Sequence, residues 1–282
     1  MADAVPALAP RGSEGAGMTV ATLMYHDVVL PGQADASGFP GGSAAHYKLD
    51  VAEFDAHLAA LANSGLHFVA VTDATADNAR GCLLTFDDGG ASAVAIAAAL
   101  TRHGMVGHFL VTTAQIGQPG FVTADDVRRL HAGGHVIGSH SHTHPAEISQ
   151  LDGTALAAEW TRSIGLLTAL LDTPVTVASV PGGFYSPQVA RAAASAGIRY
   201  LFTSEPTMRT QRVDGCLVLG RYTLWRGMPP QRAVALASGT GTTRERQWLA
   251  WNLKKPLKRW ARPLYGWVRR RWRDAGSSRD DT

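Results

Sequence analysis

Short apolar runs alternate with longer amphipathic segments along most of the chain. In the segment 51–65, Val51, Phe54, Leu58 and Leu61 recur at helical spacing, which predicts a helix that ends near Gly65. Further helices are predicted at 91–104, 124–134, 154–171 and 186–197. Strands are predicted at 18–25, 67–71, 82–86, 107–112, 135–139, 175–180, 198–204 and 216–222. This alternation predicts parallel βα units, wound either as a barrel or as an open sheet.

Composition divides the chain into three parts. Residues 1–17 are mostly small residues, Pro and Gly, and are expected to form a flexible lead. Residues 18–243 carry the βα pattern and are expected to form one domain. Residues 244–282 hold 12 Lys and Arg against 4 Asp and Glu, and five of the seven Trp, whereas the rest of the chain holds 14 against 19. An acidic body is therefore followed by a basic, Trp-rich tail.

Length and composition exclude several classes of protein. With 282 residues, 45% of them hydrophobic and 17% charged, the chain can bury a sizeable core and is not globally disordered. Cys82 and Cys216 are too few for a disulfide framework or a zinc finger. The chain has no apolar run of the roughly 18 residues that a membrane span needs, and its first residues do not resemble a secretory signal. A cytoplasmic protein is expected.

Polar and Gly-rich elements follow four of the predicted strands. Asp87 and Asp88 follow 82–86, His140 follows 135–139, and His26 follows the first strand, while 181–183 reads Pro-Gly-Gly after 175–180. The carboxyl ends of parallel strands meet on one face of a barrel, where such enzymes place their chemistry. The coincidence therefore indicates an enzyme active site.

The histidines near residue 140 predict a metal site. If His140 to His144 forms one helical turn, the two imidazoles face the same way, while His142 points elsewhere. Two imidazoles and the Asp88 carboxylate form a facial ligand set with open positions for water and substrate. A divalent ion there would activate water and polarise a carbonyl, and Asp87 is left beside it as a general base.

Two segments resemble the diagnostic motifs of a known family. LTFDDG at 84–89 and GHVIGSHSHTHP at 134–145 are similar to motifs of the polysaccharide deacetylase, or NodB-homology, family (carbohydrate esterase family four), and the resemblance covers roughly 20–225. It implies an α/β fold, a distorted barrel with about seven parallel strands, that removes N-acetyl groups from a glycan. It also implies that Asp87 is the catalytic base and that Asp88, His140 and His144 bind one metal ion, usually zinc.

Other positions depart from the usual pattern of the family. SVPGGFYSP at 179–187 stands where many members have an Arg-Pro-Pro-Tyr motif, and it is more similar to the version in permuted poly-N-acetylglucosamine deacetylases. The backbone at Pro181, Gly182 and Gly183 is expected to stabilise an oxyanion. Two more residues are assigned to this cleft, Tyr185 and, as a substitute for the missing Arg, Arg221.

No histidine follows His144, so the late catalytic His of most members is missing. His26 in LMYHDV resembles the N-terminal Tyr-His of the permuted type, and is expected to act as the general acid that protonates the leaving amine.

The tail is expected to meet a membrane. Residues 244–273 interleave 11 basic residues with five Trp and a single acid, and Pro256 and Pro263 are expected to break the segment into short pieces. Trp with Lys and Arg is typical of segments that bind an anionic membrane surface. Packing on the barrel is the alternative interpretation, and nucleic acid is disfavoured. A membrane surface would suit a lipid-linked glycan.

The sequence thus predicts a metal-dependent hydrolase that removes an N-acetyl group from an amino sugar. Three alternatives stay open at this point: a deformylase, an O-acetyl esterase that uses the same site, and a non-catalytic protein that binds a glycan or a membrane.

Overall fold

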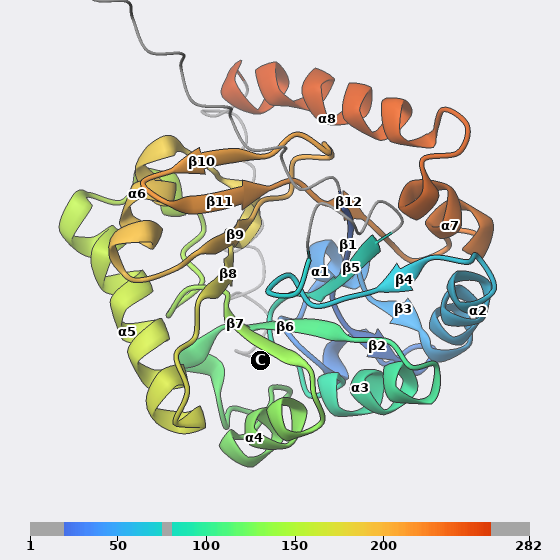
Figure 1. Cartoon of the computed structure of the whole chain (residues 1–282), viewed down its shortest axis with the longest axis horizontal. Coiled ribbons are helices and arrows are strands. Elements are labelled where there is room, and N and C mark those ends of the chain that lie inside the picture. The colour runs from blue at the N-terminus through green and yellow to red at the C-terminus, as the bar shows by residue number, and fades with distance from the viewer. Residues whose placement is uncertain (1–19, 75–80, 261–282) are drawn as a thin grey trace, which may run out of the picture.

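The computed structural model describes residues 20–74 and 81–260, and of residues 254–260 it describes the backbone alone. The expected lead, 1–17, lies outside the described residues. The largest sheet has ten strands in the order β10-β11-β9-β8-β7-β6-β5-β1-β12, with β4 paired to β5, and all its ladders are parallel except β10–β11. Its strands are β1 (Ala21–Tyr25), β4 (His67–Phe68), β5 (Gly81–Phe86), β6 (Gly107–Val111), β7 (Val136–Ser139), β8 (Val177–Ser179), β9 (Tyr200–Phe202), β10 (Gln211–Val213), β11 (Cys216–Leu219) and β12 (Tyr222–Thr223). The sheet curls into a distorted barrel (Figure 1), as the sequence predicted.

Helices surround the curled sheet (Figure 1). They are α1 (Gly42–Ala45), α2 (Val51–Ala62), α3 (Ala93–Arg102), α4 (Ala124–Ala132), α5 (Gly153–Leu171), α6 (Pro187–Ser195), α7 (Pro230–Ser238) and α8 (Thr243–Trp260). A separate two-stranded ladder joins β2 (Val28–Val29) to β3 (Leu49–Asp50). None of the helices within the described residues is both long enough and apolar enough to cross a bilayer.

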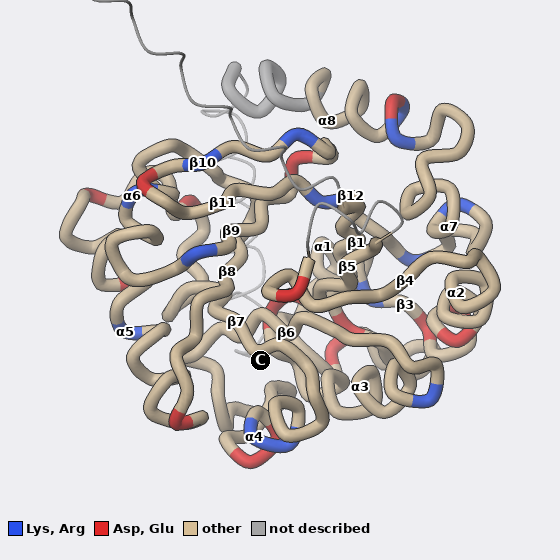
Figure 2. Tube along the Cα trace, viewed as in Figure 1, with Lys and Arg blue, Asp and Glu red and all other residues tan. Residues whose placement is uncertain are grey.

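Strand alternation separates the outer core from the barrel interior. On β5, Leu84 and Phe86 pack in the main core with α2 and α3, whereas Leu83 belongs to an interior cluster with residues such as Leu110 and Phe202. Because side chains alternate along a strand, Thr85 and then Asp87 share the inward register of Leu83. Figure 2 shows acidic positions inside the ring of strands, and other charged positions on the outer helices and around strands such as β8 and β12.

The predicted single strand at 216–222 is wrong. The segment forms two strands that pair at different places: β11 pairs with β9, and β12 pairs with β1. Gly220 and Arg221 make the step between them. Gly220 fits because a Cβ there would lie 2.4 Å from the Glu205 carbonyl oxygen. The step crosses the open seam of the barrel and places Arg221 in its interior, where the side chain is fully buried.

Helix α8 closes this seam from outside. The Gln247 side chain donates to the Thr223 carbonyl and accepts from the Thr223 N–H, which fixes α8 to β12. Further along α8, the Trp251 ring lies against Gly183, which follows β8 and lies across the seam from β12. In Figure 1, α8 extends from α7 to β10.

The expected break at Pro256 is also wrong, because α8 continues to Trp260. A proline removes one helical hydrogen bond and kinks a helix, but a helix can continue past it where the preceding turns are held in place. Here Arg244, Gln247 and Trp251 hold those turns. Pro263 lies outside the described residues.

Candidate active site

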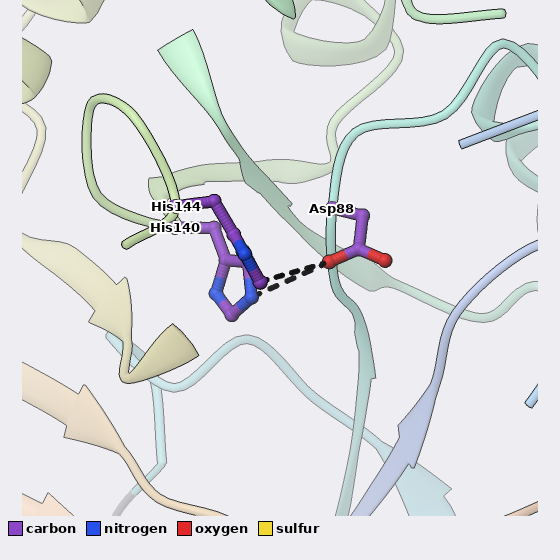
Figure 3. Close-up of side chains that lie close together, drawn as sticks. All are labelled: Asp88, His140 and His144. Carbon is purple, nitrogen blue, oxygen red and sulfur yellow. Dashed lines mark ion pairs between the residues drawn. The ribbon is translucent and has the colours of Figure 1, made fainter. Parts of the chain in front are cut away.

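Asp88, His140 and His144 form a cluster at the carboxyl ends of β5 and β7 (Figure 3). The Asp88 Oδ1 atom lies 3.4 Å from His140 Nε2 and 3.8 Å from His144 Nε2. One ligand atom from each residue lies within 4.8 Å of the other two. Asp88 and His140 are buried and His144 is half-buried, so the cluster has one partly open side.

The His140–His144 segment is a bent loop and not the expected helical turn. Its rings nevertheless meet, with centroids 5.0 Å apart. Glu159 of α5 holds the loop by accepting from the N–H groups of residues 142 and 143. His142 bonds to Thr113 and points elsewhere, as expected. Asp88 and His144 both have positive φ, at 80° and 55°. Non-glycine residues adopt this strained region where the surrounding structure imposes it, which is common at functional sites.

Asp87 is paired with Arg221. The two guanidinium Nη atoms donate to the two carboxylate oxygens, each at 2.7 Å, in a bidentate pair that is fully buried. Arg221 also donates to Thr85 and to the Thr203 carbonyl. Burial by itself would raise the pKa of Asp87, but the Arg221 guanidinium and the His140 ring hold that pKa well below its usual range. Asp87 is therefore unprotonated at neutral pH, and Arg221 fixes its orientation.

Ser179 joins the Asp87 pair to the cluster. Its hydroxyl donates to Asp87 Oδ1 at 3.1 Å and lies 2.6 Å from His140 Nδ1. Since the hydroxyl hydrogen is used on Asp87, the hydroxyl oxygen must accept from Nδ1–H of His140. His140 Nε2 is then the unprotonated nitrogen, with its lone pair directed to Asp88. Sequence reasoning missed Ser179, because a serine at a strand end matches no motif.

The cluster has the chemistry of a cation site. Burial raises the pKa of Asp88 to about 7, and although His26 opposes this shift, the Asp27 and Asp87 carboxylates add to it. Burial lowers the pKa of His140 to about 3 and also lowers that of His144, so both rings are neutral at pH 7. A buried carboxylate without a counter-charge and two neutral imidazoles fit a divalent cation, which would compensate the carboxylate.

His26 lies at the end of β1, close enough to Asp87 and Asp88 to affect the pKa of each. Its Nδ1 atom is buried and has no hydrogen-bond partner among the described residues. Asp27 does not orient His26 by a described hydrogen bond. It accepts instead from the Ser37 and Ser92 hydroxyls.

The Pro181–Gly183 turn follows β8. Gly182 and Gly183 have φ values of 61° and 72°, and a Cβ on Gly183 would lie 3.1 Å from the Trp251 ring. Trp251 therefore lies against the Pro181–Gly183 turn, and no sequence motif indicated it. Tyr185 packs against the hydrophobic core beside α5 and α6, and its hydroxyl accepts a hydrogen bond from the Gln211 side chain of β10. No described hydrogen bond connects Tyr185 with Asp88, His140 or His144.

A segment before β3 covers another side of the cluster. The buried Lys48 Nζ donates to the carbonyls of Ala34, Ser37 and Phe39 at 2.6–2.7 Å. The Phe39 ring then packs on His144, with centroids 4.7 Å apart. No motif in the sequence placed this segment at the site.

Comparisons with known proteins agree with this geometry. The family model of polysaccharide deacetylases matches residues 75–201. No curated protein sequence matches the chain.

Several solved structures share the fold. The Streptococcus pyogenes deacetylase PplD in complex with acetate has a TM-score of 0.66 at 18% identity, over 77% of this chain and 97% of that one. IcaB from Ammonifex degensii has a TM-score of 0.61 at 21% identity, over 79% and 98%. The polysaccharide deacetylase BC0361 from Bacillus cereus has a TM-score of 0.65 at 18% identity, over 77% and 68%.

The matched segment contains Asp87, Asp88, His140, His144 and Ser179, whereas His26 and Arg221 come from strands outside it. The fold, the Asp88–His140–His144 cluster and the family model, which matches residues 75–201, all agree with the resemblance of the sequence to the polysaccharide deacetylase family.

Proposed function

We propose that the protein is a metal-dependent hydrolase that removes the N-acetyl group from an amino sugar of a glycan, in the manner of the permuted poly-N-acetylglucosamine deacetylases. The observation that carries the proposal is the Asp88–His140–His144 cluster beside the Asp87–Arg221 pair. The match to the polysaccharide deacetylase model supports deacetylation of a glycan, and the cluster supports dependence on one divalent ion per chain, for which zinc is the first candidate.

Each residue then has a role. A cation held by Asp88, His140 and His144 would polarise the acetamide carbonyl and make water more acidic. Asp87 accepts the proton of the attacking water on a lone pair that Arg221 and Ser179 leave free, since a carboxylate offers about four such positions. The backbone N–H groups at Gly182 and Gly183 stabilise the oxyanion. His26 donates a proton to the departing amine.

The test compares three proteins for zinc content and for acetate released from N-acetylglucosamine oligomers. The wild type is expected to bind zinc and release acetate, Asp87→Asn to keep zinc and lose most turnover, and Asp88→Ala to lose both. Equal loss of zinc in the two variants would contradict the division of roles. Formate release from a formylated sugar, or acetate release from an ester alone, would favour the deformylase or the esterase.

We further propose that α8 docks the protein on an anionic membrane surface. Arg244, Gln247 and Trp251 face the barrel, whereas Trp248, Leu249 and Leu253 are 45%, 51% and 72% exposed. These three exposed apolar side chains lie within six residues, in a segment rich in Lys and Arg. Such a helix face fits the boundary between lipid headgroups and acyl chains. A membrane-borne, lipid-linked glycan is then the natural substrate, and a peripheral position on the cytoplasmic leaflet stays a prediction.

Liposome flotation tests the docking. The wild type is expected to float with vesicles that contain phosphatidylglycerol and to stay behind with neutral vesicles. A Trp248→Ser/Leu253→Ser variant should no longer float, whereas Leu166→Ser, which removes a 40% exposed leucine from α5, is the matched control. Equal flotation of the double variant and the wild type would remove the proposal.

A further inference from the structure

The Pro181–Gly183 turn, whose N–H groups are proposed above to stabilise the oxyanion, contacts both the histidine loop and α8. A Cβ on Gly182 would lie 3.7 Å from the carbonyl oxygen of Ala146, just after the bent loop that carries the two clustered histidines. A Cβ on Gly183 would lie 3.1 Å from Cη2 of Trp251, the far edge of the indole ring. The turn therefore joins the metal-ligand side of the site to the helix that closes the seam.

The turn has little rigidity of its own. Gly182 and Gly183 both have positive φ, at 61° and 72°. Glycine adopts such values without steric strain, but it also has the widest choice of other conformations. The hydrogen bond across the turn, from the Phe184 N–H to the Pro181 carbonyl, is long at 3.4 Å. The direction of the two glycine N–H groups is therefore set by the side chains that pack on the turn.

Two side chains pack on Gly183. Ser204, which lies just after β9, has its Cβ and Oγ atoms 3.3 Å from the position that a Cβ on Gly183 would take. Ser204 is small, and its hydroxyl donates to the Met24 sulfur at 3.8 Å. The Trp251 ring is large and half-buried, and an indole offers a broad rigid contact with few rotamers to lose. Of the two, Trp251 is the side chain that can fix the turn.

The backbone that carries Trp251 is itself fixed to the barrel. Gln247 makes two hydrogen bonds to the Thr223 backbone, at 3.1 and 2.9 Å. Arg244 donates to two carbonyls of α7 and stacks on Tyr222, with its guanidinium carbon 5.2 Å from the ring centroid. Because residues four apart share one face of a helix, Gln247 holds the face of α8 from which Trp251 projects. The helix thus delivers the ring to the turn in a defined position.

We propose that Trp251 is a positioning residue for the reaction: it keeps the Gly182–Gly183 turn in the position that stabilises the oxyanion, and it acts through the turn without touching the substrate. This inference rests on the deacetylase function proposed above. It makes α8, which lies outside the segment 75–201 that the family model matches, a part of the active site.

The experiment measures kcat and KM for acetate release from the soluble pentamer of N-acetylglucosamine by the full-length, zinc-loaded protein without membranes. Trp251→Ala is expected to lower kcat on the order of tenfold to a hundredfold, because a displaced oxyanion donor stabilises the transition state less. KM and zinc content should not change. Trp251→Phe, a shorter ring, should have an intermediate kcat. Arg246→Ala removes an exposed side chain from the same helix and is the matched control.

Three results would overturn the inference. An unchanged kcat in Trp251→Ala would show that the turn does not need the ring. A raised KM with a preserved kcat would mean that the ring binds the substrate directly. Loss of zinc together with kcat would mean that the whole site is damaged and not the turn alone. If Trp251→Ala does not fold, Trp251→Phe is judged by the same criteria.

Hydrogen exchange separates this inference from the proposed function. Trp251→Ala should exchange faster than the wild type at residues 182–184, with exchange in β5 unchanged, whereas Arg246→Ala should match the wild type at both places. If the wild type releases no acetate, the deacetylase proposal fails, and exchange alone decides whether Trp251 holds the turn. Equal exchange at 182–184 in the wild type and Trp251→Ala would overturn the inference.

Discussion

Asp87 and Asp88 are neighbours in sequence, but their pKa values are shifted in opposite directions. The inward register of β5 directs Asp87 to Arg221, which keeps its pKa low, while the positive φ of Asp88 turns the next carboxylate to the histidines. Among the described residues, the only side chains within ion-pair distance of Asp88 are the His140 and His144 rings, which are neutral at pH 7. Burial raises the pKa of Asp88 to about 7. At neutral pH Asp87 is thus an unprotonated carboxylate beside the cluster, and Asp88 is the carboxylate whose burial a bound cation would compensate.

Ser179 permits a prediction at this scale. Ser179→Ala removes the acceptor for His140 Nδ1–H, so the tautomer that presents Nε2 is no longer enforced. Loss of such an outer partner usually weakens metal affinity about 10–100-fold. Competition with a zinc chelator measures the affinity, and Ser195→Ala, an exposed serine on α6, is the control. An affinity equal to that of the wild type would show that Ser179 does not set the tautomer.

Arg221 permits a second prediction. Arg221→Met leaves the Asp87 carboxylate buried without its counter-charge, which is expected to reduce the free energy of unfolding by about 3–5 kcal/mol. Adding Asp87→Asn removes the stranded charge and should restore part of the loss. Urea unfolding of the two single variants and the double variant tests this. Losses that simply add would contradict the pairing.

The motifs could predict Asp87, Asp88, His140 and His144 because their residue types and spacing are specific. Arg221 could be named only as a candidate, since its partner is set by the crossing at Gly220 and not by any local pattern. Ser179 and Trp251 could not be found, because their contacts exist only after β8 and α8 reach the same region as β5 and β7.

Among the elements, the segment 31–47 depends most on a single side chain. It has little regular structure, only a short 3-10 turn and the four-residue α1. Lys48 compensates by bonding three of its carbonyls, and the Asp27–Ser37–Ser92 network fixes it to α3. Phe39 and Tyr47 are thereby kept against His144 and His26.

Lys48→Met is expected to release this segment. Met fills a similar volume but leaves three carbonyls without their donor, at a cost of about 3 kcal/mol or more in the free energy of unfolding. Urea unfolding measures the loss, and hydrogen exchange should increase within 31–47 before it increases in β5. The exposed Arg212→Met is the control. Unchanged exchange in 31–47 would mean that Lys48 does not hold it.

Most helices and strands could be predicted, either because their periodicity is strong, as in α2, or because a short apolar run is clearly bounded, as in β5. The segment 216–222 was misread since its apolar run is continuous, and only the pairing partners on either side of the seam divide it. The helix α7 and the strand β10 were not predicted, and 67–71 forms only the two-residue β4.

At the scale of the whole molecule, several histidines are buried in the neutral form. His108 donates to the Leu84 carbonyl and accepts from the Val71 N–H inside the barrel, and burial lowers its pKa to about 4. Burial also lowers the pKa of His57 and His135. At a pH between the unfolded and the folded pKa values, these rings are protonated in the unfolded chain and neutral in the folded protein.

Stability is therefore expected to fall as the pH decreases from about 6.5 to about 4. In that interval the unfolded His108 is protonated and the native ring is not, so unfolding takes up a proton, and His108 alone accounts for a loss on the order of 3 kcal/mol. Urea midpoints at pH 7, 6, 5 and 4.5 measure the slope. His108→Gln should start from a lower stability and show a shallower slope, and an unchanged slope would contradict the assignment.

The distance in sequence between Asp87 and Arg221 has a consequence for synthesis. The two residues are 134 positions apart, and at roughly 5–20 residues per second the ribosome adds Arg221 on the order of ten seconds after Asp87. During that time the nascent barrel holds a carboxylate whose counter-ion does not yet exist, so the interior must stay hydrated and the seam open. Chains arrested before Arg221 should remain sensitive to protease at β5, and chains arrested after α8 has emerged should become resistant.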